Sequence, residues 1–162
     1  MNNPPQKSIG EKVLSLWQRL KPLPGGTWIF SRLLGRVVPY TATIGANVLE
    51  LRPGFTRVEL RDHKRIRNHV NSIHAIALAN LGEMASGIAL LSGLPADVRG
   101  IVTNINIEYL KKARGTLIAE GRADIPVVMD DMTHQVYTEI KDVEGDLVAQ
   151  ITVDWQLGVI AK

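Results

Sequence analysis

The sequence predicts an α+β domain in which an antiparallel sheet wraps around one long apolar helix, with short helices at the N-terminus. Three patterns indicate this. Apolar residues recur at helical spacing near the N-terminus, residues 73–91 are almost wholly apolar, and segments on both sides of that stretch alternate with a period of two. The chain has 162 residues, which is long enough to bury a core without disulfides. It contains no cysteine.

Two short helices are expected first. Helical spacing covers residues 13–20, the Pro- and Gly-rich segment 22–26 ends it, and a second helical pattern covers 28–37. The simplest interpretation is that both helices pack on the rest of the domain. The alternatives are a lid over an apolar tunnel or a contact with a membrane surface. We therefore expect an N-terminal helical extension, residues 1–38, and a main domain, residues 39–162.

Six strands are expected in that main domain. Two of them, 43–52 and 55–62, flank the turn dipeptide Pro53-Gly54. After the long helix, a strand through 102–109 is expected to have one buried face. The remaining alternating segments are 116–123, 136–141 and 147–155, and the turn Glu144-Gly145-Asp146 joins the last two.

Charge and composition exclude several classes of function. The net charge is +3, but residues 1–38 contain six basic residues and one acidic residue, so the main domain is slightly acidic. There is no basic stripe with interleaved aromatic residues, so no nucleic-acid partner is expected. No uninterrupted apolar stretch precedes Leu20, which argues against a signal peptide, and the lack of cysteine fits a reducing compartment. The expected location is the cytoplasm.

Glu83 is the best candidate for chemistry in this chain. It is a carboxylate on the apolar helix, where an acidic residue also argues against a membrane span, because it costs about 2.5 to 3.5 kcal/mol at a bilayer centre. Asn80 and Gly87 share a helix face with it, so both are candidate substrate contacts beside a gap that glycine leaves. The alternative is that Glu83 pairs with an arginine or with strand amides inside a dimer interface.

The start of the long helix is a candidate oxyanion site. His74 stands there after Asn71 and Ser72, which are both good N-cap residue types. The amides of Ala75 and Ile76 are then expected to point out of the positive end of the helix, where they suit a developing oxyanion. The alternative is that Asn71 and Ser72 only cap the helix.

The sequence lacks the patterns that are typical of several other kinds of site. His69, His74 and Glu83 do not have metal-ligand spacing, such as two histidines four residues apart on a helix. There is also no nucleophile elbow and no glycine-rich phosphate loop. We therefore expect neither a metal nor a cofactor.

The segment from Asn68 to Glu83 resembles the hotdog-fold thioesterase superfamily. The pattern is an asparagine, a histidine six residues later and an acidic residue nine residues after that, which here are Asn68, His74-Ala75 and Glu83. The strand 105–113 is also similar to the long central strand of that superfamily. The resemblance covers about residues 40–158, and it is strongest with the phenylacetyl-CoA thioesterase type and a related branch with an N-terminal helical extension.

The resemblance implies hydrolysis of an acyl-CoA or acyl-carrier thioester, with coenzyme A as part of the substrate. Glu83 would be the general base or the nucleophile, and the amide of Ala75 or Ile76 would polarise the carbonyl. Asn68 would orient the water or the thioester from a partner chain, and His74 would position the carbonyl or hold the turn. The resemblance also implies a homodimer, or a dimer of dimers that forms a homotetramer, with active sites at the interface.

Two departures from the family pattern stand in this sequence. The usual Gly-Gly after the histidine is Ala75-Ile76, and Lys111 occupies a position where relatives often have Ser or Thr. Lys111, Lys112 and Arg114 are candidates for binding CoA phosphates; the alternative is a solvated strand end. Two other functions on the same fold stay open, namely non-catalytic acyl or lipid binding and an acyl-CoA dehydratase or hydratase.

Overall fold

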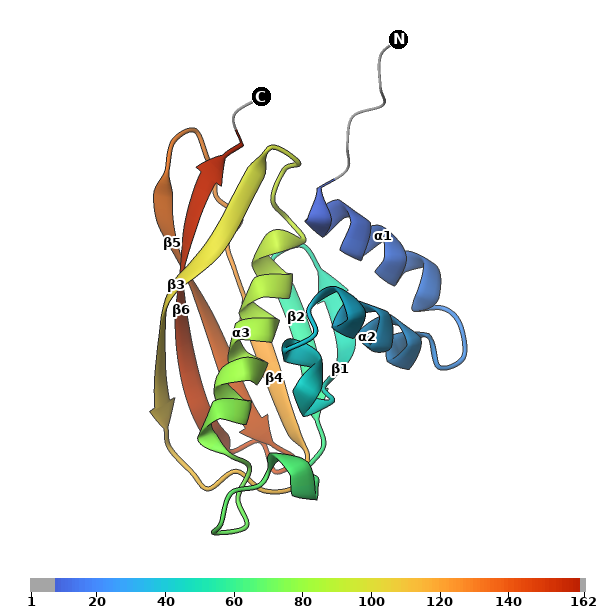
Figure 1. The fold of residues 1–162 in the computed structure, drawn as a ribbon, viewed down its shortest axis with the longest axis vertical. Coiled ribbons are helices and arrows are strands. Elements are labelled where there is room, and N and C mark those ends of the chain that lie inside the picture. The colour runs from blue at the N-terminus through green and yellow to red at the C-terminus, as the bar shows by residue number, and fades with distance from the viewer. Residues whose placement is uncertain (1–7, 161–162) are drawn as a thin grey trace.

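The computed structural model describes residues 8–160. Two N-terminal helices come first, and one long helix separates two strands from the four that follow (Figure 1). The elements in chain order are α1 (Ile9–Leu20), α2 (Gly26–Val37), the 3-10 helix η1 (Thr41–Ile44), β1 (Asn47–Arg52), β2 (Phe55–Leu60), the 3-10 helix η2 (Lys64–Ile66), α3 (Ala75–Leu91), β3 (Val98–Tyr109), β4 (Leu117–Arg122), β5 (Met132–Asp142) and β6 (Leu147–Val159).

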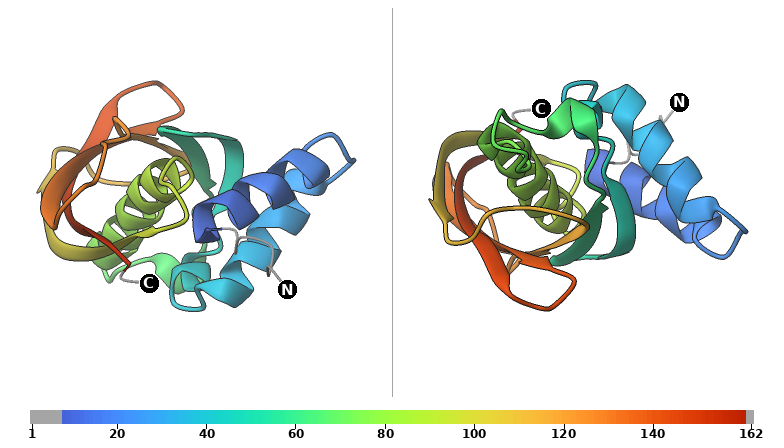
Figure 2. Two further views of the ribbon diagram at one scale, coloured as in Figure 1. Left: turned by 90° about the horizontal axis from the view of Figure 1, so that it is seen from above. Right: turned by 90° about the horizontal axis from the view of Figure 1, so that it is seen from below.

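The six strands form one antiparallel sheet in the order β1-β2-β4-β5-β6-β3. The sheet curls around α3, and the views along the helix show it enclosed on most sides (Figure 2). This confirms the predicted antiparallel sheet wrapped around one central helix. The strands β1 and β3 are the two edges, because each pairs with one neighbour only.

Small residues let α3 sit close to the sheet. A Cβ at Gly82 would lie 2.9 Å from the side chain of Ile151, and a Cβ at Gly121 on β4 would overlap the backbone of Ala85. Leu81 and Leu90 are fully buried in the resulting core, which explains why this stretch is apolar almost all round.

The N-terminal helices pack on the same core, as the simplest interpretation predicted. Ser8 caps α1 through a capping box with Glu11. Trp17 of α1 and Phe30 of α2 meet edge to face with their centroids 5.0 Å apart, and both side chains are buried. Both belong to the hydrophobic cluster that also contains Val48 of β1. The division of the chain at residue 38 stays a prediction.

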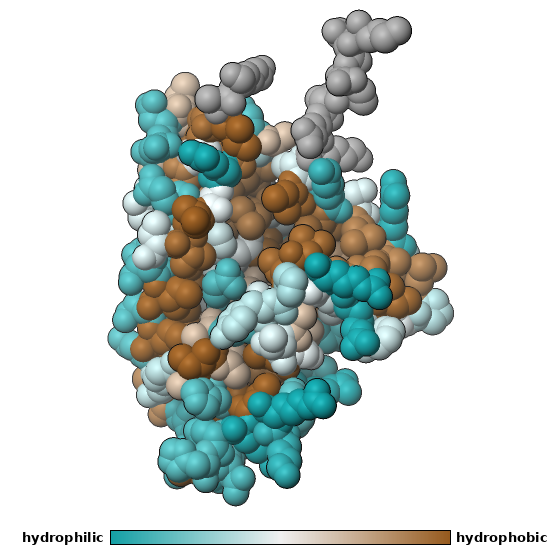
Figure 3. All heavy atoms as spheres, viewed as in Figure 1, coloured by the Kyte–Doolittle hydropathy of each residue, from teal (hydrophilic) through white to brown (hydrophobic). Residues whose placement is uncertain are grey.

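Two details of the strand assignment were wrong. The first strand begins at Asn47, because residues 41–44 form a 3-10 helix that ends at Gly45 with φ 69°. The strand β3 does not have a buried face, and Val98 is its only buried residue. An edge strand lacks a neighbour on one side, and β3 leaves a row of hydrophobic residues on the surface (Figure 3).

Candidate active site

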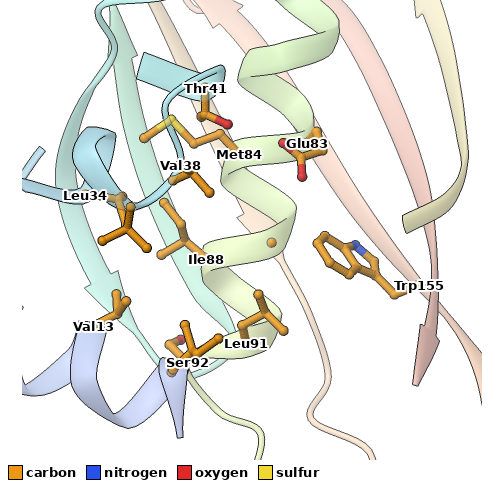
Figure 4. Close-up of a pocket in the computed structure, with 14 residues that line it drawn as sticks. Val13, Leu34, Val38, Thr41, Glu83, Met84, Ile88, Leu91, Ser92 and Trp155 are labelled. Carbon is orange, nitrogen blue, oxygen red and sulfur yellow. The ribbon is translucent and has the colours of Figure 1, made fainter. Parts of the chain in front are cut away.

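Glu83 lies on α3 beside an apolar cavity of about 120 Å³. The cavity lies between α3, the N-terminal helices and β6, and Figure 4 shows Glu83 and Trp155 on the same flank of α3. Its lining is almost entirely apolar and comes from Ile9, Gly10, Val13, Leu34, Val37, Val38, Thr41, Glu83, Met84, Gly87, Ile88, Leu91, Ser92 and Trp155. The N-terminal helices are therefore part of the wall of this cavity as well as of the core.

The carboxylate of Glu83 has no ion pair and no hydrogen-bond partner within residues 8–160. Within these residues the half-buried side chain is thus not held by an arginine, and pairing inside a dimer interface stays an alternative. Burial raises the pKa of Glu83 above its ordinary value, because desolvation disfavours the charged form. A carboxylate with a raised pKa and a free lone pair is suited to accept a proton near neutral pH.

The start of α3 is capped by His74, and not by Asn71 or Ser72 as predicted. His74 has extended backbone angles, and its Nδ1 accepts a hydrogen bond from the amide of Ile76 at 3.1 Å. Asn71 instead takes a left-handed φ of 55° in the preceding loop, and the hydroxyl of Ser72 donates to the carbonyl of Ala113. The Ile76 amide is therefore already engaged.

The amide of Ala75 forms no hydrogen bond to any residue between 8 and 160. It is one of the first N–H groups of α3, which have no partner inside the helix and lie at the positive end of its dipole. Of the two predicted oxyanion donors, Ala75 is the one that this structure leaves available.

Asn68 holds the loop before α3. Its side-chain oxygen accepts hydrogen bonds from the amides of Val70 and Ser72, both at 3.1 Å. These two bonds order the residues that lead into the His74 cap. The side-chain oxygen of Asn68 is thus engaged within its own loop.

The predicted site residues do not all meet within one chain. Glu83 follows Ala75 by eight positions on α3, which places them about 12 Å apart along the helix axis. Asn80 is buried and donates from Nδ2 to the carbonyl of Tyr40 at 3.3 Å, away from Ala75. The space beside Gly87 is filled by Trp155, whose ring would lie 3.0 Å from a Cβ at position 87.

The basic residues that follow β3 differ in whether their charged groups are already bound to carboxylates. Lys111 bridges Asp142 at 2.5 Å and Asp146 at 2.7 Å, and these carboxylates raise its pKa. Arg114 donates from Nε to the carbonyl of Asn71 at 3.3 Å, and Lys112 is exposed. Lys112 and Arg114 therefore remain available to a phosphate, whereas the ammonium of Lys111 is committed to two carboxylates.

Sequence reasoning missed Trp155 and the α1 residues of the cavity wall. Trp155 stands in the inward phase of the last strand, which the alternation had already indicated, so its place on the core side could have been found. The contribution of Val13 depends on how α1 folds back over α3, and no local pattern reports that packing.

The described part of the chain contains neither a candidate metal site nor a candidate membrane-spanning helix. Residues 8–160 contain no group of three or more histidine, aspartate or glutamate residues that could hold a metal ion. In the same part of the chain, no helix has the length and apolar character needed to cross a membrane.

Comparison with known proteins places these features in a family context. The family described as "Domain of unknown function (DUF4442)" matches residues 26–157. A Halobacterium salinarum protein named "Putative esterase" is 34% identical over 83 residues, which are 48% of this chain and 55% of that protein. The chain thus spans about half the length of this curated relative.

Solved structures share most of this arrangement. A structural-genomics protein is 26% identical with a TM-score of 0.78, and the match covers 94% of this chain and 99% of that one. A Pseudomonas aeruginosa protein described as "Probable Thioesterase" is 22% identical with a TM-score of 0.73, covering 85% and 97%. A Streptococcus mutans protein bound to acetyl CoA is 20% identical with a TM-score of 0.61, covering 71% and 90%. These likenesses confirm the predicted hotdog fold.

Proposed function

The chain belongs to the DUF4442 family, and from its site we propose that it hydrolyses the thioester of an acyl-CoA with Glu83 as general base or nucleophile. Its similarity to proteins named as thioesterases and as an esterase supports the hydrolysis of a thioester or ester in general. The single observation that carries the finer proposal is Glu83, an unpaired carboxylate with a raised pKa in an apolar cavity.

The proposed reaction uses two parts of α3. The carboxylate of Glu83 takes a proton from a water that attacks the thioester carbon, or attacks that carbon itself. The carbonyl oxygen then becomes negative, and the free amide of Ala75 stabilises it at the positive helix end. When water is the nucleophile, collapse of the tetrahedral intermediate breaks the C–S bond, the proton taken up by Glu83 passes to the leaving thiolate, and the thiol and the acid are released. When Glu83 is the nucleophile, collapse expels the thiolate and leaves a mixed anhydride on Glu83. A water then hydrolyses this anhydride, which frees Glu83, releases the acid and supplies the proton of the thiol.

The two parts come from different chains in this proposal. A thioester carbon must lie about 3 Å from its nucleophile, and its oxygen must lie about 3 Å from its donor. The spacing of about 12 Å along α3 is longer than these contacts span when Glu83 of the same chain attacks the thioester directly, and it leaves little overlap when a water lies between them. A second copy that pairs along the exposed edge of β3 would bring its own helix start to the site, so we propose a homodimer as the active form.

The size of the cavity supports a division of the substrate between the inside and the surface. Pockets that enclose a drug-sized ligand measure about 300 to 1,000 Å³, and this cavity measures about 120 Å³. It therefore suits the acyl group, with coenzyme A outside it. The Streptococcus mutans protein of the same fold was solved with acetyl CoA, and Lys112 and Arg114 are the basic residues that we propose for the CoA phosphates.

Non-catalytic acyl binding is the second candidate function. One observation favours it, because the Ile76 amide is capped by His74 and is not free to bind a carbonyl oxygen. An acyl-binding domain would keep the cavity and would release no thiol.

Thiol release from a panel of acyl-CoAs tests the proposal. We expect wild-type turnover, and a loss of about 10² to 10⁴ in kcat for Glu83→Gln with acyl-CoA binding retained. Glu144→Gln, an exposed change in the turn between β5 and β6, is the matched control and should keep full activity. Binding without thiol release in the wild type would favour the second candidate, and equal turnover of both variants would remove Glu83 from the mechanism.

A further inference from the structure

Trp155 carries a buried polar atom for which residues 8–160 supply no partner. The side chain is 4% exposed and lines the Glu83 cavity from β6. Its Nε1 is shielded from solvent and has no hydrogen-bond partner. An indole N–H can only donate, and leaving such a donor buried without an acceptor costs free energy. The orphaned donor indicates that an acceptor binds here.

His134 presents a second orphaned atom beside the first. His134 on β5 is the direct cross-strand partner of Trp155 on β6, so their Cβ atoms lie about 4.5 to 5.5 Å apart on one face of the sheet. The Nε2 of His134 is also buried and has no hydrogen-bond partner in the part of the chain that the structure describes. Buried polar groups are normally paired with a hydrogen-bond partner. Two unpaired polar atoms on adjacent strands therefore indicate a site for a polar group of a ligand.

The ring of Trp155 packs one helical turn from Glu83. The ring of Trp155 packs against Gly87, which follows Glu83 by four residues on the same face of α3. One turn is about 5.4 Å along the helix. Figure 4 shows the indole and the Glu83 carboxylate on the same flank of α3. A group that binds to Trp155 from the cavity would therefore lie within a few carbons of a thioester held at Glu83, and His134 is the cross-strand neighbour of Trp155.

A hydroxyl group fits both atoms. Its oxygen accepts from the indole N–H, and the hydroxyl can either donate to His134 Nε2 or accept from it, so it satisfies both neutral forms of the imidazole. A plain acyl chain would leave both atoms unpaired in an apolar cavity. We propose that Trp155 and His134 form a polar subsite that binds a hydroxyl on the acyl chain, a few carbons from the thioester. This inference rests on the proposed thioesterase function and narrows its substrate class to hydroxyacyl thioesters.

The test compares octanoyl-CoA with octanoyl-CoA that carries a hydroxyl at C3, C4 or C5. Dissociation constants are measured by calorimetry on the Glu83→Gln protein, so that binding is read without turnover. We expect at least one hydroxylated ligand to bind roughly tenfold more tightly than the plain chain. Adding Trp155→Phe, which keeps an aromatic ring but removes the N–H, should abolish that preference. Trp28→Phe removes the same group from an exposed site on α2 and should keep it.

His134→Phe provides a second route if Trp155→Phe alters the fold, and it should reduce the same ratio. The proposal is overturned if no hydroxylated ligand is preferred, or if the preference survives both changes, as expected when only a buried water pairs these atoms. Failure of the thioesterase proposal would appear separately, as binding without thiol release by the wild-type protein.

Discussion

The hydroxyl of Tyr109 donates a hydrogen bond to the carbonyl of Ala75 at 3.2 Å. This bond ties the end of the exposed edge strand β3 to the first residue of α3. The surface that we propose for pairing is therefore connected to the amide that we propose for the oxyanion. A second copy that pairs on β3 would meet the helix start at the same interface.

Ala75→Pro tests the oxyanion role with little disturbance of the helix. Proline is tolerated at the first helical position, and His74 already has the extended backbone that must precede a proline. The change replaces the amide hydrogen with the proline ring, and we expect kcat to fall about 10² to 10³ with the helical circular dichroism retained. Ala75→Gly keeps the amide and is the control. Equal activity of the two variants would exclude this amide.

Mixed dimers test whether two chains share a site. A dimer of one Glu83→Gln chain and one Ala75→Pro chain contains one intact site and one doubly defective site if each site uses both chains. Co-expression with two different affinity tags should then recover up to half of the wild-type activity. Sites confined to single chains would recover none, which would contradict the shared arrangement.

The pH profile should follow Glu83. Burial raises its pKa, so kcat/KM should fall with decreasing pH through a midpoint above about 4.3, the value of an unperturbed glutamate. The same shift acts on stability, because the folded state favours the neutral acid and loses stability as pH rises from the unfolded pKa to the folded pKa. Glu83→Gln should therefore be more stable than wild type at about pH 8 and lose that advantage near pH 4. Thermal unfolding at both pH values measures the difference, and an advantage that is the same at both would contradict the assignment.

Charged side chains placed on β3 should disrupt the proposed pairing of two chains along this strand. Ile101 and Ile105 are 68% and 38% exposed on this strand, and replacing both with lysine places charges on the proposed interface. Light scattering should show a monomer with little thioesterase activity. Val127→Lys with Val143→Lys changes two other exposed apolar residues and should leave the assembly intact. A stable dimer of the first variant would place the interface elsewhere.

Basic residues near β3 should differ in their effect on KM. Lys112→Ala with Arg114→Ala should raise KM for acyl-CoA several-fold, more at low salt, because charge attraction is screened by ions. Lys111→Ala should leave KM unchanged, since Lys111 is held by Asp142 and Asp146. Acyl-pantetheine lacks the nucleotide phosphates and should show no difference among these proteins. A raised KM for that substrate would indicate damage to the cavity.

Loss of the helix cap should cost stability. His74→Ala removes the acceptor for the Ile76 amide, and loss of an N-cap typically costs about 0.5 to 2 kcal/mol. His74→Asn replaces it with a favoured cap and should restore most of the free energy of unfolding. Chemical denaturation of the three proteins measures this. If the asparagine variant were as unstable as the alanine variant, the histidine ring would have a packing role instead.

Much of the fold was predictable because it depends on periodicity. The apolar run before Leu91 and the alternation of the later strands fixed the helix and the sheet, and Glu83 stood out as the one carboxylate in that run. The cap was not predictable, because the loop gives Asn71 a left-handed backbone that leaves His74 as the residue with cap geometry. The exposure of β3 depends on the order of strands in the sheet, which alternation does not report.

The partners of polar site residues were also beyond sequence reasoning. Lys111 meets Asp142 and Asp146 across 31 and 35 residues of chain. The orphaned atoms of Trp155 and His134 become visible only when β5 and β6 are placed in register. Such contacts depend on tertiary packing, which residue type and local spacing do not specify.

The wall of the Glu83 cavity comes partly from inside and partly from outside the region that the family model matches. Residues 9–13 of α1 help to form it, yet the family match begins at residue 26. The acid on α3 thus lies inside the region that the family model matches, and part of the wall of its cavity lies outside that region. A change in this one leading helix would therefore reshape the proposed acyl cavity without altering Glu83 itself.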